Sequence, residues 1–289
     1  MKIQSLSIVV PAGRCINNCK FCVAQMVEES YTDQMDSNKP FYDLYQRDFL
    51  RRLDFARDNG CNTVMLTGNA EPQQNRPFLE KFGTLNAKLE RPFRWIEMQT
   101  TGTLLDDGYL RFLRNHVGVS TISISLCSFD SARNAEICGM KKPVDLEHLC
   151  HEIKRYDFNL RLSVNLTDEF DGSTSEELFR ACREVFHADQ VTFRVLYTSG
   201  DETDQDHWIA AHAAAPVTVD AVRSYIQSHG VKLERLEYGA MKYSVMGMST
   251  VLDEDCMAKA DDKDEYKYLI LRPNCKLYSK WDDPASLIF

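Results

Sequence analysis

Three cysteines lie within eight residues near the amino terminus: Cys15, Cys19 and Cys22. A cubane iron-sulfur cluster takes four thiolates, and a structural zinc ion likewise takes four protein ligands. This segment supplies three, so a metal site built on it keeps one position open for chemistry. Two alternatives remain: three unrelated buried thiols, disfavoured by the polar residues between them, and a zinc site that draws a fourth ligand from elsewhere.

The spacing Cys-x-x-x-Cys-x-Phe-Cys resembles the signature of radical S-adenosylmethionine (radical SAM) enzymes, including the aromatic Phe21 before the third cysteine. The resemblance implies a [4Fe-4S] cluster held by Cys15, Cys19 and Cys22, with the amino and carboxylate groups of SAM on the open iron. An electron from the cluster would cleave SAM to methionine and a 5'-deoxyadenosyl radical, which abstracts a hydrogen atom from the substrate. The resemblance also implies an electron donor such as flavodoxin or ferredoxin.

Composition limits the classes of partner. The chain has 289 residues, 44% hydrophobic and 27% charged, so it can bury a substantial core. Its formal charge of -9 and sequence pI near 5.3 argue against a protein that grips phosphate backbones. We therefore expect a small-molecule or peptidic substrate and no nucleic-acid partner.

The ten cysteines are mostly scattered, and the first residues lack the long apolar run of a secretory signal. No stretch approaches the roughly 20 apolar residues of a membrane helix. We therefore expect a cytoplasmic protein with reduced thiols and no membrane partner. Only Cys256 and Cys275 fall in the last hundred residues. Two thiols cannot hold a second four-thiolate cluster, so none is predicted.

Strand-like apolar runs alternate with helical patterns, which is typical of βα units and a parallel sheet. The helical stretch 45–59, for example, repeats Phe49, Leu53 and Ala56 on one face before Gly60. The predicted strands cover residues 5–10, 63–67, 93–99, 119–126, 160–166 and 191–197.

Several of these strands alternate apolar and polar residues, as Ile122 and Ile124 do with Ser123 and Ser125. Parallel strands covered on both faces usually read as continuous apolar runs. A curved sheet with helices outside and a polar, ligand-filled interior explains the alternation better. An antiparallel sandwich with one wet face is the alternative, which the intervening helices disfavour. The predicted fold is therefore α/β, a partial (β/α)6 barrel of the radical SAM type.

Residues 1–200 are predicted to form this partial barrel, and residues 201–289 a segment that completes or covers its mouth. After Gly200 the regular alternation of strand-like and helical runs ends, and one further helix is expected. The elements predicted in the second part are the helix 217–229 and strands at 232–236, 268–272 and 276–279.

The segment after the second strand resembles the Gly-Gly-Glu-Pro stretch that binds the SAM amino group in this family. It departs from that pattern because Asn69 and Ala70 stand where glycines are more usual. Active sites of such barrels lie at the carboxyl ends of the strands, so polar residues there would contact SAM. The residues assigned to cofactor binding by this resemblance are Gly68, Asn69, Ala70, Glu71, Ser123, Ser125, Ser163, Asn165 and Arg194.

The segment 97–103 resembles, in outline, the Glu-Thr-Asn-Gly stretch of 7-carboxy-7-deazaguanine synthase. The size of the chain also resembles that of queuine lyase, a radical SAM enzyme that breaks queuine to release 7-aminomethyl-7-deazaguanine for queuosine salvage. A deazaguanine pocket needs hydrogen-bond acceptors and a flat surface. The substrate-binding candidates of suitable type are Glu97, Gln99, Thr100 and Tyr197; no further catalytic residue is assigned.

Three functional hypotheses follow. The first is a radical SAM enzyme, a lyase, that acts on a small heterocycle such as queuine. The second is a peptide- or protein-modifying radical SAM enzyme or a glycyl-radical activase. The third is a non-catalytic iron-sulfur or zinc-binding module.

Overall fold

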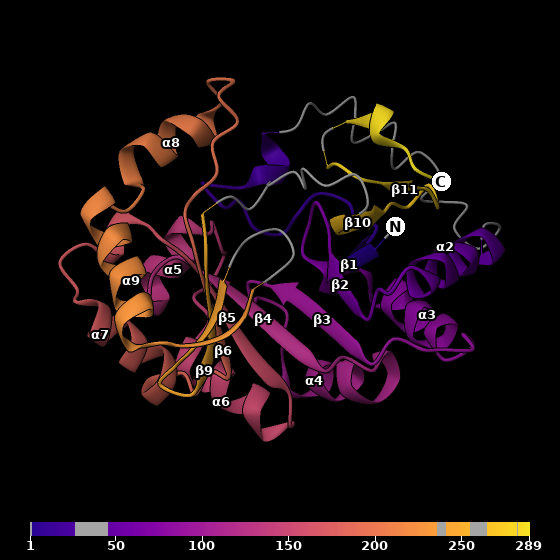
Figure 1. Cartoon of the computed structure of the whole chain (residues 1–289), viewed down its shortest axis with the longest axis horizontal. Coiled ribbons are helices and arrows are strands. Elements are labelled where there is room, and N and C mark those ends of the chain that lie inside the picture. Colours follow the sequence, from indigo (N-terminus) through magenta and orange to yellow (C-terminus); the bar gives the residue numbers. More distant parts are fainter. Residues whose placement is uncertain (1, 27–45, 236–240, 255–264, 282) are drawn as a thin grey trace.

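The computed structural model describes residues 2–26, 46–235, 241–254, 265–281 and 283–289 (Figure 1). Its strands form one sheet. The first six strands are β1 (Lys2–Val9), β2 (Thr63–Thr67), β3 (Trp95–Thr100), β4 (Thr121–Leu126), β5 (Asn159–Asn165) and β6 (Gln190–Arg194). The later strands are β7 (Val231–Arg235), β8 (Met241–Val245), β9 (Met248–Asp253), β10 (Glu265–Leu271) and β11 (Leu277–Tyr278).

Helices follow the strands and surround the curved sheet on its outer side (Figure 1). The α-helices are α2 (Gln46–Asp58), α3 (Arg76–Asn86), α4 (Asp107–Phe112), α5 (Ser131–Ile137), α6 (Leu146–Arg155), α7 (Ser175–Arg180), α8 (Asp204–His212) and α9 (Pro216–His229). Shorter helical segments are η1 (Val23–Gln25), η3 (Pro72–Asn75), η4 (Leu113–Val117), η5 (Asp168–Phe170), η6 (Ala181–Val185) and η7 (Pro284–Ser286).

The strand order is β11-β10-β1-β2-β3-β4-β5-β6-β9-β8-β7. Every neighbouring pair from β10 through β1 to β6 and on to β9 is parallel, whereas β11, β8 and β7 pair antiparallel. Within the described residues, the two ends of this order do not pair with each other. The sheet is therefore an open, partial barrel, which confirms the predicted fold class and excludes the antiparallel sandwich.

The alternation seen in the sequence has a direct structural cause. Ile122, Ile124 and Leu162 are fully buried and belong to one hydrophobic cluster that includes Leu149 and Ile153 of α6. Successive side chains of a strand point to opposite faces, so the residues between them face inward. The parallel register aligns Gln99 with Ser123 and Ser123 with Arg161, so polar residues form continuous rows across the inner face.

All six predicted strands of the first part are present. Residues 63–67 match β2 without a shift, and β3 and β4 each begin two residues later than expected. β6 ends at Arg194 rather than at 197, because the chain leaves the sheet there toward α8. The predicted helices 45–59 and 217–229 correspond to α2 and α9.

The carboxyl-terminal part extends the same sheet at both edges. β9 pairs with β6, and β10 pairs with β1, where Ser5 lies opposite Tyr268. The runs predicted at 232–236, 268–272 and 276–279 correspond to β7, β10 and β11, although residue 236 lies outside the described residues. β8, β9 and α8 were not predicted. A domain division at residue 200 stays a prediction.

None of the helices in the described ranges combines the length and apolar character that crossing a bilayer requires.

Gly83 of α3 tests how tightly the outer layer is packed. A Cβ atom at this position would lie 2.2 Å from the backbone oxygen of His116. We expect Gly83→Ala to lower the free energy of unfolding by about 1–3 kcal/mol, because backbone cannot yield as a side chain can. Urea unfolding followed by circular dichroism measures the change. Gly108→Ala is the matched control, since Gly108 is helical but exposed; an equal effect at both positions would contradict close packing at Gly83.

Candidate active site

The three motif cysteines lie in the loop that leaves the carboxyl end of β1, and all three are partly exposed. The Cys22 amide donates to the Cys19 oxygen at 3.2 Å, and the Gln25 amide donates to the Cys22 oxygen at 3.0 Å. These bonds fold the loop into η1. We call residues 13–22 the cysteine loop.

The thiols lie close enough to affect one another. Burial raises the pKa of Cys22 to about 11, and the charges of Cys19 and Cys15 add to the increase. Burial is also the main cause of the raised pKa of Cys15. The pKa of Cys19 is raised first of all by a hydrogen bond with Cys138. Because metals bind thiolates, a cation at the loop would have to displace these protons.

No three His, Cys, Asp or Glu side chains in the described ranges are grouped as ligands of one metal ion. A cubane cluster does not require that grouping, because each of its cysteines binds a different iron atom.

A buried carboxylate anchors the cysteine loop. Glu71 Oε1 accepts hydrogen bonds from Asn17 Nδ2 (3.3 Å), the Thr101 amide (2.9 Å) and Thr101 Oγ1 (2.5 Å). Its Oε2 accepts from Thr100 Oγ1 at 2.8 Å. Asn17 also donates to Thr101 Oγ1 at 2.8 Å. Glu71 therefore joins the loop after β1 to the carboxyl end of β3.

Two further contacts hold the loop. Gln74 accepts from the Ile16 amide and donates to the Arg14 oxygen, both at 3.0 Å. On the other side, the Asn18 amide donates to the Cys138 oxygen at 3.1 Å. Gly139 permits this approach, because a Cβ atom there would lie 2.6 Å from the Asn18 oxygen. The loop is thus held from both sides.

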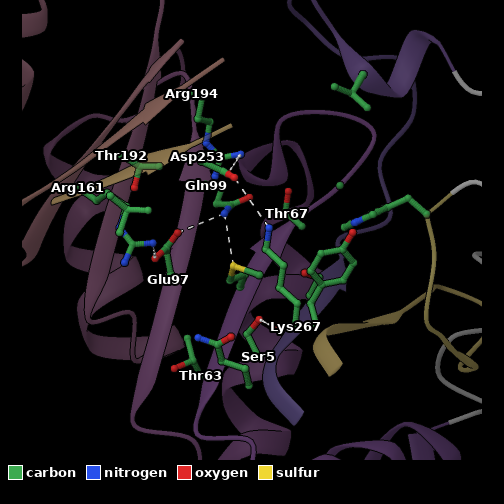
Figure 2. Close-up of a pocket in the computed structure, with 18 of the residues that line it drawn as sticks. Ser5, Thr63, Thr67, Glu97, Gln99, Arg161, Thr192, Arg194, Asp253 and Lys267 are labelled. Carbon is green, nitrogen blue, oxygen red and sulfur yellow. Dashed lines mark hydrogen bonds and ion pairs between the residues drawn. The ribbon is translucent and has the colours of Figure 1, made fainter. Parts of the chain in front are cut away.

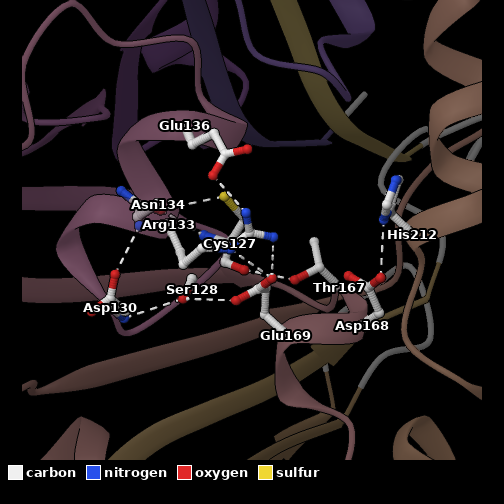
Figure 3. A network of polar contacts seen from close by, with 10 residues as sticks. All are labelled: Cys127, Ser128, Asp130, Arg133, Asn134, Glu136, Thr167, Asp168, Glu169 and His212. Carbon is white, nitrogen blue, oxygen red and sulfur yellow. Dashed lines mark hydrogen bonds and ion pairs between the residues drawn. The ribbon is translucent and has the colours of Figure 1, made fainter.

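The segment that carries Cys138 is fixed in turn by the ends of β4 and β5 (Figure 3). The Cys127 amide donates to Asn134 Oδ1 at 2.9 Å, and Thr167 Oγ1 donates to the Cys127 oxygen at 2.6 Å. Arg133 of α5 and Glu169 of η5 form an ion pair of 2.6 Å, which links the segment after β4 to the segment after β5. These contacts set the position of α5 beneath the cysteine loop.

Gly68 begins the turn after β2, where a Cβ atom would lie 3.0 Å from the Val10 oxygen. Glycine therefore allows the ends of β1 and β2 to approach closely. Asn69 and Ala70 are not among the residues with positive φ, so neither needs the conformation that glycine favours. Gly68 and Asn69 line a cavity inside the sheet, and Ala70 is buried. The Glu71 carboxylate is directed to the cysteine loop and to β3.

A cavity of about 490 Å³ occupies the interior of the partial barrel, and we call it the lumen (Figure 2). It extends from Val23 and Ala24, which directly follow the cysteine loop, to Ser5 in β1 and Thr63 at the start of β2. Side chains from β1, β2, β3, β5, β6, β8, β9 and β10 line it. It therefore connects the cysteine loop to a polar interior.

Charged groups dominate one wall of the lumen (Figure 2). Arg161 Nη1 lies 2.5 Å from Glu97 Oε2, and Gln99 Nε2 donates to Glu97 Oε1 at 3.2 Å. Arg194 Nη1 lies 3.7 Å from Asp253 Oδ2. The sequence-predicted residues Glu97, Gln99 and Arg194 thus meet in one cavity.

Other predicted residues lie elsewhere. The cofactor candidates of β4 and β5, although on the inner face, are outside the set that lines the lumen: Ser123, Ser125, Ser163 and Asn165. Asn165 Nδ2 donates to Ser125 Oγ at 3.1 Å, so this pair is internally bonded. Thr100 is directed to Glu71, and Tyr197 follows the end of β6, half-buried and outside the lining. Their proposed roles in binding stay predictions.

Sequence reasoning missed several residues of the site. Asn17 gave no signal, because its partners lie 54 and 84 positions away. Asp253 and Lys267 line the lumen from strands that are next to β6 and β1 in space but not in sequence. The sequence of β9, Met-Ser-Thr-Val-Leu-Asp, does not alternate polar and apolar residues, so it gave no signal of an inner face.

The residues present fit the expected groups. The cysteine loop offers three thiols, and the residues that directly follow it, Val23 and Ala24, line the lumen. Within the described part of the chain, Asn69 Nδ2 and Arg194 Nε are buried and have no hydrogen-bond partner. Both residues line the lumen, and an unsatisfied buried donor is costly unless a ligand supplies an acceptor. A SAM molecule with carboxylate and ribose oxygens would supply such acceptors.

Glu71 provides a direct test of the anchor. We expect Glu71→Ala to lower the free energy of unfolding by about 3 kcal/mol, because buried donors of Asn17, Thr100 and Thr101 lose their charged acceptor. Iron bound after anaerobic reconstitution should fall by more than half. Urea unfolding and iron assay measure the two effects. Glu90→Ala, at an exposed position, is the control; wild-type iron content in Glu71→Ala would contradict an anchoring role.

Comparisons with known proteins support this assignment of the fold. The chain is similar to SuiB of Streptococcus suis bound to its precursor peptide SuiA (16% identity, TM-score 0.57), covering 96% of this chain and 59% of SuiB. It is similar to native anSMEcpe with bound AdoMet (13% identity, TM-score 0.56), covering 96% of this chain and 74% of that one. It is also similar to coproporphyrinogen III oxidase (HemN) from Escherichia coli, a radical SAM enzyme (13% identity, TM-score 0.55), covering 81% of this chain and 55% of HemN.

At these identities the likeness shows a shared fold, and the present chain spans about three fifths of the SuiB chain. A comparison with curated protein sequences gave no match. Residues 9–177 match the model of the Radical SAM superfamily, and this range contains the cysteine loop and β2 to β5. The chain therefore belongs to the radical SAM superfamily, whose members are enzymes that use a [4Fe-4S] cluster and SAM.

Proposed function

We propose that this chain cleaves SAM reductively and directs the resulting radical at a small molecule held in the lumen. The observation that carries the proposal is the continuity between the cysteine loop and the lumen, since Val23 and Ala24, which directly follow Cys22 in η1, line the cavity. When bound at the loop, the cluster supplies the electron for SAM cleavage. The chain's own residues then bind, orient and enclose the reactants.

Each part of the site has a separate task in this proposal. Cys15, Cys19 and Cys22 ligate the cluster and leave one iron for SAM. Asn69 and Arg194, each with a buried donor that has no partner among the described residues, bind acceptor groups of SAM. The strands around the lumen hold the substrate and exclude bulk water, which protects a reactive radical from side reactions.

The cysteines give the first test. We expect wild-type protein, reconstituted without oxygen, to bind about four irons per chain and to form 5'-deoxyadenosine from SAM after reduction. Replacing Cys15, Cys19 and Cys22 together by alanine should abolish both. Cys150→Ala, which removes a buried thiol of α6, should leave both unchanged. Stably bound zinc without SAM cleavage would favour a non-catalytic metal-binding module instead.

The substrate proposed first for assay is queuine, with a lyase reaction that releases 7-aminomethyl-7-deazaguanine. The supporting observation is that Glu97 and Gln99, whose polar side chains suit a heterocycle, line the lumen, whereas Thr100 and Tyr197 do not. Incubation of reduced enzyme with SAM and queuine, followed by mass spectrometry, should reveal the product. If queuine stays intact while a peptide fraction stimulates SAM turnover, the proposal changes to peptide modification.

A further inference from the structure

Two buried thiols that the proposed function does not use lie beneath the cysteine loop. Cys138, which follows the last residue of α5, is 1% exposed, and its side chain is hydrogen-bonded to that of the proposed cluster ligand Cys19. Cys127, which follows β4, is fully buried, and its Sγ lies 3.7 Å from Cys138 Sγ. A row of three thiols therefore leads from the inside of the fold to the cysteine loop.

The backbone fixes the position of Cys138 against Cys19. The Asn18 amide donates to the Cys138 oxygen at 3.1 Å. The Lys20 amide donates to the Ile137 oxygen at 3.0 Å. Cys19 lies between these two bonds, so the main chain, rather than a side-chain rotamer alone, sets the contact between the two thiols.

The direction of the hydrogen bond between these thiols depends on whether a metal is bound. A thiol can donate one proton and can also accept one. A cysteine that ligates iron does so as a thiolate, so Cys19 at a bound cluster can only accept. Cys138 is then the donor of the contact.

The other neighbours of Cys138 leave its proton for Cys19. Asn134 Oδ1 lies 3.9 Å from Cys138 Sγ, but it already accepts from the Cys127 amide at 2.9 Å and lies 3.3 Å from Cys127 Sγ (Figure 3). The Asn134 oxygen is therefore the nearer acceptor for the Cys127 thiol. A thiolate is also a stronger acceptor than a neutral amide oxygen, because charge strengthens a hydrogen bond.

The contact between Cys138 and Cys19 lies in an apolar environment. Cys127, Ile137 and Cys138 form a small buried cluster. Phe21 and Trp208 pack against this cluster, and their ring centroids are 6.0 Å apart. A hydrogen bond to a charged group is electrostatically stronger in such surroundings than in water.

We infer that the Cys138 thiol donates a hydrogen bond to Cys19 when Cys19 ligates the cluster, and that this bond raises the reduction potential of the cluster. The inference rests on the proposed function and deepens it, because it names a residue that acts on electron transfer through a ligand. Hydrogen bonds to cluster sulfurs favour the reduced state, whose charge is more negative. One electron enters from an external reductant and the proton stays on Cys138, so no bond is made or broken.

The midpoint potential of the reconstituted cluster tests the inference. It is measured without SAM, by titration with titanium(III) citrate followed by electron paramagnetic resonance. Cys138→Ala should make reduction about threefold less favourable, which at about 59 mV per tenfold is a fall of about 30 mV. Cys138→Ser keeps a donor and should restore most of the potential. Cys127→Ala is the matched control, because it removes a similarly buried thiol but keeps the backbone hydrogen bonds of that residue; it should leave the potential unchanged.

A second measurement detects the proton of the hydrogen bond. Electron-nuclear double resonance of the reduced wild-type cluster, compared in light and heavy water, should show an exchangeable proton coupled to the cluster. The signal should be lost in Cys138→Ala and kept in Cys127→Ala. Because a thiol is a weak donor and a hydroxyl a stronger one, Cys138→Ser should change the coupling.

A wild-type potential in iron-loaded Cys138→Ala, or an equal fall in Cys127→Ala, would overturn the inference. If Cys138→Ala binds too little iron for titration, the proton signal decides: its absence from the wild type, or an identical signal in Cys138→Ser, overturns the inference.

These results are separable from the proposed function. Wild-type protein that holds a cluster but forms no 5'-deoxyadenosine contradicts only the proposed function, since the potential can still be measured on it. Cleavage of SAM by the wild type, with an unchanged potential in Cys138→Ala, contradicts only the inference.

Discussion

The active site depends on one buried carboxylate. Glu71 accepts hydrogen bonds from Asn17 in the cysteine loop and from Thr100 and Thr101 at the end of β3. The loop has no regular secondary structure before η1, so its conformation depends on such contacts. Because Glu71 is 5% exposed, water cannot replace it as the acceptor. The segment after β2 thus holds the cysteine loop through the Glu71 side chain, and the SAM contact predicted for Glu71 stays a prediction.

The lumen extends this arrangement from the loop into the sheet. Parallel strands place alternate side chains inward, and the register aligns them into rows that reach from Gln99 to Arg161. Helices bury the other side of each strand, as for Ile122 and Leu162. One sequence pattern therefore builds both the core and a polar interior that a ligand can occupy.

Sequence alone predicted the first six strands, the parallel sheet and its polar face, because these depend on local periodicity. It also located the cysteine loop, whose spacing is local. It did not predict β9 or the anchoring role of Asn17, since both depend on contacts distant in sequence. The sequence predicted which residues of a strand face inward, but not which of them line the lumen. Ser125, for example, lies on the inner face but accepts a hydrogen bond from Asn165 and is not among the lining residues.

Pairing of β10 with β1 also affects how the protein forms in the cell. Ser5 donates a hydrogen bond to the Lys267 oxygen across 262 positions of sequence. On the ribosome, the edge of β1 and most of the lumen thus exist before the strand that covers them has been made. The complete cavity can therefore form only after β10 has been synthesised.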